Sequence, residues 1–209
     1  DYKMIAHLFF KIKVYFFYRL KAVNAHGLHS PFLFYFYNEV IAANKEFYFF
    51  KQFRGLLSAY TKFISEVDAL FLYRWVAFYK PNSVFVASEN FPASLALAVP
   101  SNKKSLSVSS LCHFSNQELN IFEGVGISLS EGHDADLIYL EEIDAFTKNI
   151  ILNYKCVIIK KPHQNELKDR IWKELCSLKD ISISIDLFQF GILLVDKKIS
   201  KQHFVVKMG

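Results

Sequence analysis

The chain has 209 residues, a formal net charge of +5 and 17% aromatic residues, with 22 Phe against 2 Trp. A chain of this length buries roughly 70% of its unfolded surface, so it needs no disulfide bonds, and we expect one domain with an appendage. The basic balance permits attraction to nucleic acid or anionic lipid. Its lysines are scattered along the sequence, however, and this excludes the basic track with interleaved aromatics that specific nucleic-acid binding requires.

The cysteines indicate a reducing compartment. Cys112, Cys156 and Cys176 form an odd set without a CxxC pair. Such a set is typical of free thiols in a cytosolic protein, where a cysteine in an apolar stretch packs as a small hydrophobic residue. We therefore expect a cytoplasmic location, with a position at the membrane periphery as the alternative.

Residues 4–20 (MIAHLFFKIKVYFFYRL) form the first predicted element, and their apolar content raises the question of a membrane. Lys11 and Lys13 interrupt the centre of this segment, and a charge at mid-bilayer is costly. The pattern therefore predicts an amphipathic helix. Packing of this helix on the domain is favoured over contact with a membrane surface.

The first 80 residues are predicted to be a helical extension (domain 1–80) ahead of a second domain (81–209). Apolar residues recur at three- and four-residue spacing, as they do on one face of a helix, in the ranges 4–22, 31–43, 47–64 and 67–79.

The segment between the first two helices reads as a tight connection. Asn24 and Gly27 are residue types that tolerate the left-handed conformation that ends a helix. Ser30 is then expected to cap the next helix with its side chain, and Pro31 to take its first position, where a missing N–H costs nothing.

From residue 81 onward, short apolar runs alternate with amphipathic stretches. The runs predict strands at 83–87, 105–109, 125–130, 136–140 and 156–160, with helices at 93–99, 115–122, 143–152 and 164–177. Ser115 and Glu118 have the spacing of a capping box, which marks a helix start. Such alternation predicts a mostly parallel sheet with helices on both faces.

The C-terminal region breaks this alternation. Residues 181–198 and 202–208 give strands in close succession, which predicts an antiparallel hairpin at the edge of the sheet. Strand–helix units that end in such a hairpin are the arrangement of class I methyltransferases. The predicted fold class is therefore α/β, a Rossmann-like class I methyltransferase fold preceded by an N-terminal helical region.

Two stretches resemble a known family. HGLHSPFLFYFYNEVI (26–41) and ISIDLFQFGILLVDKKISKQHFVVK (183–207) are similar to the two ends of a bacterial family of class I S-adenosylmethionine (SAM)-dependent methyltransferase-like proteins. That family opens with a His-Gly-x-His-Ser-Pro-Phe signature. The likeness covers most of the chain except 64–72, where a glycine-rich segment of the family is missing. It implies the same fold, with SAM as the family's cofactor.

The first strand departs from what this resemblance implies. Family members have a Glu-Leu-Gly…Gly loop there, whose glycines let the backbone approach the cofactor. In this chain Val86 stands at the acidic position, Ser88 at the first glycine and Pro92 at the later one. Ser109 and Ser110 follow the second strand, where the family has an acid for the ribose hydroxyls. A proline supplies no amide, so this loop is not expected to cradle SAM in the usual way.

The fourth and fifth strands also depart from the family. Glu141 matches a family aspartate, and Trp172 matches a family tryptophan that sets the register of VIIKKPHQNELKDRIW (157–172). Lys160 and Lys161 then stand where the family has two aspartates. Two ammonium groups do not coordinate a divalent cation. We predict instead that Glu141 forms an ion pair with Lys160 or Lys161.

Three functions remain open from the sequence. The leading hypothesis is a degenerate, non-catalytic methyltransferase-like protein with no cofactor, which binds another protein or itself as a scaffold subunit. The alternative is an active SAM-dependent methyltransferase with an atypical site, in which Ser88, Glu89, Asn90 and Glu141 contact the cofactor, since methyl transfer needs mainly positioning. A third hypothesis is an anion site made by Lys160, Lys161 and His163.

Three other polar residues are interpreted as structural. His26 and His29 lack a third ligand at helpful spacing, so they are not predicted to bind a metal. Asp186, near the start of the hairpin, is expected to accept backbone hydrogen bonds there.

Overall fold

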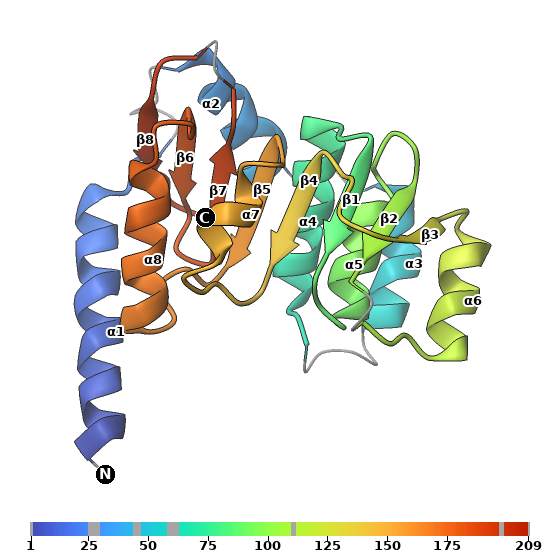
Figure 1. The fold of residues 1–209 in the computed structure, drawn as a ribbon, viewed down its shortest axis with the longest axis horizontal. Coiled ribbons are helices and arrows are strands. Elements are labelled where there is room, and N and C mark those ends of the chain that lie inside the picture. Colours follow the sequence, from blue (N-terminus) through green and yellow to red (C-terminus); the bar gives the residue numbers. More distant parts are fainter. Residues whose placement is uncertain are drawn as a thin grey trace. The chain divides into compact units, whose positions relative to one another are not determined.

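The computed structural model describes residues 2–24, 30–43, 47–57, 63–109, 112–196 and 199–208. The chain divides into two compact units. Figure 1 labels the helices and strands. Unit 1 comprises Asp1–Gly27 and Leu137–Met208, and unit 2 comprises Leu28–Asp136 and Gly209. The predicted boundary near residue 80 stays a prediction.

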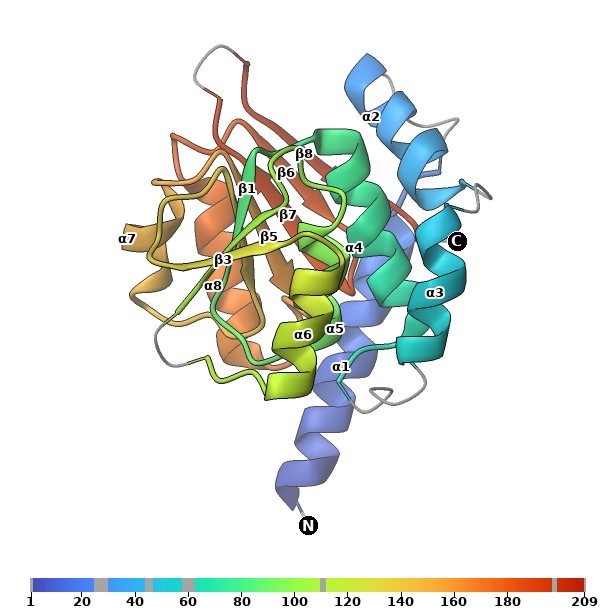
Figure 2. The same ribbon diagram turned by 90° about the vertical axis from the view of Figure 1, so that its right-hand side faces the viewer.

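Unit 2 begins with helices that pack through aromatic rings. They are α2 (Pro31–Phe36), which runs directly into the π-helix η2 (Tyr37–Ile41), then α3 (Tyr48–Leu57) and α4 (Glu66–Tyr79). Phe49 of α3 stacks on Tyr73 of α4 at 5.5 Å between centroids, and the two helices lie side by side in Figure 2. Phe36 contacts Trp75 edge to face. The predicted helix 47–64 is shorter than expected, because Phe63 and Ile64 are not helical; residues 58–62 lie outside the described part of the chain.

The rest of unit 2 is a parallel three-stranded sheet with its connecting helices. Its elements are β1 (Ser83–Val86), α5 (Phe91–Ala98), β2 (Ser105–Val108), α6 (Asn116–Gly124) and β3 (Ser128–Glu131), and the strand order is β3-β2-β1. The capping box predicted at the start of α6 is confirmed. Ser115 Oγ accepts from the Glu118 amide, and the Glu118 carboxylate accepts from the Ser115 amide.

Unit 1 contains a mixed sheet in the order β4-β5-β7-β6-β8. Its elements are α1 (Tyr2–Lys21), β4 (Leu137–Leu140), α7 (Thr147–Ile151), β5 (Cys156–Lys160), α8 (Glu166–Ser177), β6 (Ile183–Asp186), β7 (Phe190–Leu194) and β8 (Gln202–Val205). Strands β4 and β5 are parallel, β7 runs antiparallel to both β5 and β6, and β8 runs parallel to β6. The antiparallel hairpin predicted at the C-terminal end is therefore confirmed as β6–β7.

The strand orders β3-β2-β1 and β4-β5-β7-β6, with helices between the parallel strands, are those of the Rossmann-like class I methyltransferase fold. The predicted fold class, including an N-terminal helix, is confirmed. Among the described residues, no helix combines the length and apolar content that crossing a membrane requires.

Helix α1 is attached to the C-terminal end of unit 1. The Tyr18 hydroxyl donates to the carbonyl of Val206 at 2.6 Å. After the helix, Val23 forms a parallel bridge with Val206, and its amide donates to the Val205 carbonyl at 3.0 Å. The first and last segments of the chain are therefore hydrogen-bonded neighbours.

The connection after α1 is described only in part. Gly27 and the two histidines of the signature, His26 and His29, lie outside the described residues. Ser30 is the N-cap of α2 and Pro31 follows it in the first turn, as predicted. The predicted hydrogen bond from the cap is wrong, because the Ser30 side chain makes none.

Candidate functional site

The first candidate site lies at the carboxyl ends of β4 and β5 in unit 1. Lys160 Nζ lies 2.6 Å from Glu141 Oε1, and the Tyr139 hydroxyl donates to the same oxygen at 3.2 Å. Parallel neighbouring strands bring their last residues together, so this ion pair follows directly from the pairing of β4 with β5. The predicted pair is confirmed, with Lys160 rather than Lys161 as the partner.

A second lysine completes this strand end. Lys168, on the first turns of α8, has a side chain that is only 3% exposed. Its ammonium donates to the main-chain carbonyl of Glu141 at 2.7 Å and to Gln164 Oε1 at 2.8 Å, and it lies 3.0 Å from the Glu142 carboxylate. A buried ammonium is tolerated only when its donors are satisfied in this way. Lys168 therefore ties α8 to the end of β4.

Lys161 behaves differently from Lys160. It is exposed, and its backbone has a φ of 48°, in the left-handed region where a non-glycine residue is strained. Its amide donates to the Gln189 carbonyl at 2.7 Å, which fixes the chain as it leaves β5. Whether Lys160, Lys161 and Glu141 contact an anion or a cofactor stays a prediction.

The β1–α5 loop of unit 2 holds the other predicted site residues. Ser88 Oγ accepts from the Asn90 amide at 3.1 Å. Asn90 is buried; its side chain caps α5 by accepting from the Ala93 amide at 3.1 Å and also donates to the Phe63 carbonyl. Glu89 is exposed. Ser88 Oγ and the side chain of Asn90 are therefore engaged in hydrogen bonds within the loop, with the start of α5 and with Phe63.

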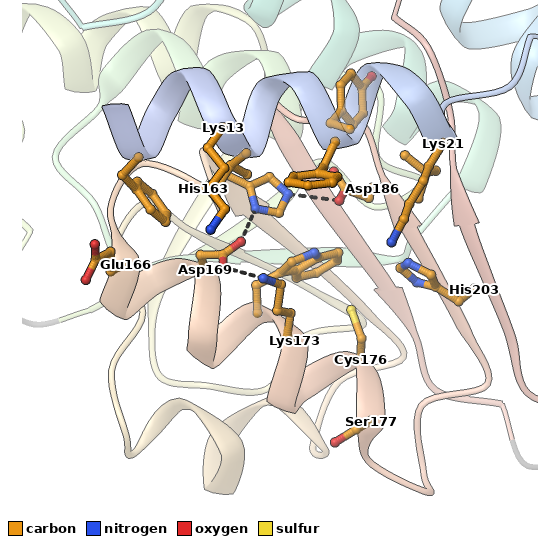
Figure 3. A pocket seen from close by; sticks show the side chains of 16 residues that line it. Lys13, Lys21, His163, Glu166, Asp169, Lys173, Cys176, Ser177, Asp186 and His203 are labelled. Carbon is orange, nitrogen blue, oxygen red and sulfur yellow. Dashed lines mark hydrogen bonds and ion pairs between the residues drawn. The ribbon is translucent and has the colours of Figure 1, made fainter. Parts of the chain in front are cut away.

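A cavity of about 780 Å³ opens in unit 1 between α1, α8 and strands β6 and β8 (Figure 3). Its wall is partly aromatic and partly charged. It is formed by Phe10, Lys13, Val14, Phe17, Tyr18, Lys21, His163, Glu166, Asp169, Trp172, Lys173, Cys176, Ser177, Asp186, His203 and Val205. In Figure 3, Lys13 and Lys21 reach from α1 into this cavity.

His163 lies between two carboxylates at the base of the cavity. Its Nδ1 is 2.7 Å from Asp169 Oδ1, and its Nε2 is 2.8 Å from Asp186 Oδ2. Asp169 also forms an ion pair with Lys173 at 2.6 Å, and Asp186 accepts from the Phe188 amide at 2.9 Å. The structural role predicted for Asp186 in the hairpin is thus confirmed, and its bond to His163 is an addition.

The two carboxylates determine the charge of this histidine. Burial alone would lower the pKa of His163, but its hydrogen bonds to Asp169 and Asp186, together with their charges, raise it from 6.5 to about 9. Burial likewise opposes ionisation of Asp169, yet the bonds from His163 and Lys173 keep its pKa below the usual value. With both ring nitrogens donating, His163 is an imidazolium at neutral pH and has no lone pair with which to act as a base or to bind a metal.

Packing fixes this cluster in place. The Phe188 ring stacks on the His163 ring, with 5.5 Å between centroids, and touches Tyr15 and Tyr18 of α1. Trp172 is buried under the hairpin, where a Cβ on Gly191 would come within 2.6 Å of the indole. Any side chain at Gly191 would therefore displace Trp172 from the cavity wall.

Burial shifts the pKa of three further side chains in the cavity, Cys176, Tyr18 and His203. Burial raises the pKa of the Cys176 thiol to about 12 and the pKa of Tyr18 to about 12, while it lowers the pKa of His203. At neutral pH the thiol and the phenol are protonated. Among the described residues, no group of three or more His, Cys, Asp or Glu side chains is placed to hold a metal ion.

Sequence reasoning located one of these two charged clusters and missed the other. Glu141 and Lys160 were recognised through the resemblance, which aligns them with acidic positions of the family. The grouping of His163, Asp169 and Asp186 depends on how α8 packs on the hairpin, and the interpretation of His163 as an anion ligand is wrong, because both of its nitrogens are engaged. No local sequence pattern indicated this cluster.

Comparisons with known proteins find solved structures of low sequence identity. No family model matches the sequence, and no curated protein matches it. The methyltransferase PaMTH1 of Podospora anserina, solved with SAH bound, is 12% identical with a TM-score of 0.44, over 71% of this chain and 86% of that one. A Klebsiella pneumoniae protein described as an O-methyltransferase is 12% identical with a TM-score of 0.48, over 74% and 93%. The fold class rests on the strand orders.

The chain is methyltransferase-like in fold.

Proposed function

We propose that this chain keeps the methyltransferase-like fold without ordinary SAM binding, and that it acts as a non-catalytic scaffold subunit that binds another protein or a second copy of itself. The observation that carries this proposal is the ion pair between Lys160 and Glu141. This ion pair engages the carboxylate of Glu141 at the end of β4. The resemblance associates an acidic residue at that position with the chemistry of the family.

The surroundings of Glu141 support this proposal. Its carboxylate is neutralised by Lys160, which is 14% exposed, and its main-chain carbonyl is taken by Lys168. A carboxylate that binds a divalent cation must offer its oxygens to the metal. Two ammonium groups beside Glu141 oppose the approach of any cation, so no step of a methyl transfer is assigned to this residue.

The β1–α5 loop supports the proposal in a second way. A glycine-rich loop offers backbone amides to a nucleotide-like ligand. Here the amide of Asn90 is bonded to Ser88, and the amide of Ala93 is bonded to Asn90. Pro92 is buried in the first turn of α5 and has no amide to offer. These residues do not fit the contacts that the family makes with SAM.

The second candidate is an active methyltransferase with an atypical cofactor site. It is favoured by the exposed carboxylate of Glu89, which directly follows β1 and precedes α5. A cofactor held mainly by shape and by such a side chain would still permit transfer, because the reaction depends largely on positioning.

Calorimetric titration of the full chain with SAM, and separately with SAH, distinguishes the two candidates without knowledge of a substrate. The proposal expects no saturable heat at millimolar ligand. Saturable binding near micromolar concentration would overturn it and support the active methyltransferase. Lys160→Met is the matched variant, since it removes the ammonium from Glu141 while retaining the apolar stem. Because the β1–α5 loop also lacks backbone contacts for SAM, we expect that this variant shows no saturable heat of binding either.

A further inference from the structure

Helix α1 has two faces, and the cavity uses only one. Phe10, Val14, Phe17 and Tyr18 line the cavity, together with two lysines of the same helix. At 3.6 residues per turn, these positions form one side of the helix. The other side contains a second apolar row, which we call the outward row: Ile5, Leu8, Phe9, Ile12, Phe16 and Leu20.

The outward row is unusually exposed for such large side chains. Its members range from 49% exposed for Ile5 to 68% for Phe9. Apart from the adjacent pair Leu8 and Phe9, neighbours in the row are three or four residues apart, so they form a stripe along a helix of 20 residues, which is about 30 Å long. The first turns of α1 extend past α8 in Figure 1. Contiguous apolar surface of this kind marks a binding face.

The charges of α1 indicate what this face binds. The helix contains no Asp or Glu. Of its exposed basic residues, Lys13 and Lys21 line the cavity, whereas Lys11 and Arg19 do not. Arg19 follows Phe16 of the row by three residues, and Lys11 follows Leu8 by three, so each lies next to the row on the helix surface. A second copy of α1 would bring the same cations against these and repel them, whereas an anionic surface would attract them. An aromatic and aliphatic stripe flanked by Lys and Arg is the pattern of helices that lie in a membrane interface.

We propose that α1 docks unit 1 on an anionic lipid surface, with the outward row inserted among the acyl chains and Lys11 and Arg19 at the phosphate level. The helix lies in the plane of the surface, because its opposite face is attached to the protein through Tyr18 and Val206. This inference goes beyond the proposed function and does not depend on whether SAM binds.

Vesicle flotation with the full chain tests the proposal. Wild-type protein is expected to float with phosphatidylcholine vesicles that contain phosphatidylglycerol, and to float much less with phosphatidylcholine alone or at high salt, where the charges are screened. Phe9→Glu is expected to lower the partition coefficient at least about tenfold, because it places a charge in the inserted row.

Phe146→Glu is the matched control. Phe146 is 72% exposed in the same unit, at the N-cap of α7, and its replacement should leave flotation unchanged. Melting curves check that both variants fold, and Ile12→Glu serves as a second variant of the row.

Three results would overturn the proposal. One is wild-type protein that stays unbound, and another is equal loss of flotation in Phe9→Glu and Phe146→Glu. The third is a dimer, seen by sedimentation without lipid, that Phe9→Glu dissociates while vesicles fail to bind; the row would then be an interface between two copies.

Discussion

Two clusters of opposite charges lie in unit 1, and they differ most in burial. The side chains of His163, Asp169 and Asp186 are 6%, 9% and 9% exposed, whereas those of Lys160 and Glu141 are 14% and 26% exposed. Buried charges interact strongly and are costly to leave unpaired, while pairs nearer the solvent contribute little. Loss of a residue from the buried cluster should therefore cost more stability than loss of the pair between Lys160 and Glu141.

Replacement of Asp186 should show most clearly that the buried cluster contributes more to the free energy of unfolding than the pair of Lys160 and Glu141. Asp186→Ala leaves the buried His163 with one carboxylate and frees the Phe188 amide, so we expect the free energy of unfolding to fall by about 3–5 kcal/mol. Urea denaturation measures this change. Asp186→Asn keeps the shape and the bond to Phe188 and should lose less. A loss below about 1 kcal/mol for the alanine variant would show that the cluster does not stabilise the fold.

The charge on His163 predicts a pH dependence of stability. Its folded pKa of about 9 lies above the ordinary value of 6.5, so its contribution is complete below pH 6.5 and is lost as the pH rises through 9. The free energy of unfolding should fall by roughly 3 kcal/mol across this window. Urea titrations at a series of pH values measure the slope, and His163→Gln should remove it. A wild-type slope retained by the variant would assign the effect to another group.

Replacement of Lys168 should have an effect on stability between those of the two clusters, because Lys168 is buried but bonds mainly to neutral groups. Lys168→Met keeps the stem and leaves the Glu141 carbonyl without its donor, which should cost about 2 kcal/mol. Arg170→Met, at an exposed position of the same helix, is the control and should change stability by less than about 0.5 kcal/mol. Equal effects of the two variants would contradict the role given to Lys168.

The ion pair of Lys160 should show the smallest effect. Lys160→Gln removes the charge beside Glu141, and we expect a loss of about 1 kcal/mol or less, reduced further at high salt. Chemical denaturation at low and high salt gives both values. A loss as large as that of Asp186→Ala would erase the distinction between the clusters.

Most elements of the fold were predictable because their signals are local. Alternation of apolar runs gave the parallel strands, and Ser115 with Glu118 marked the start of α6. The predicted helix 143–152 begins later, at Thr147, because Asp144 Oδ1 accepts from the amides of Phe146 and Thr147 and holds the preceding residues in a turn.

The candidate sites were less predictable, because they depend on tertiary packing. The pairing of Glu141 with Lys160 or Lys161 was predicted from their alignment with acidic positions of the resembled family, and only the structure selects Lys160. The burial of Lys168 could not be predicted from the sequence, because lysine is rarely buried and a lysine in a helix is expected to be exposed. The cavity requires α1 to lie against α8, and neither helix specifies that partner in its own sequence.

The attachment of α1 to the strand end at Val206 also affects the order in which the protein is made. Tyr18 leaves the ribosome 188 residues before its hydrogen-bond partner. At ordinary rates of synthesis this delay is roughly 10 to 40 seconds. Phe188, which contacts Tyr15 and Tyr18 in the folded protein, emerges only shortly before Val206, so for most of that time these two rings lack their native aromatic partner. Chaperones that bind exposed apolar helices are therefore expected to hold nascent chains of this protein until the last strand emerges.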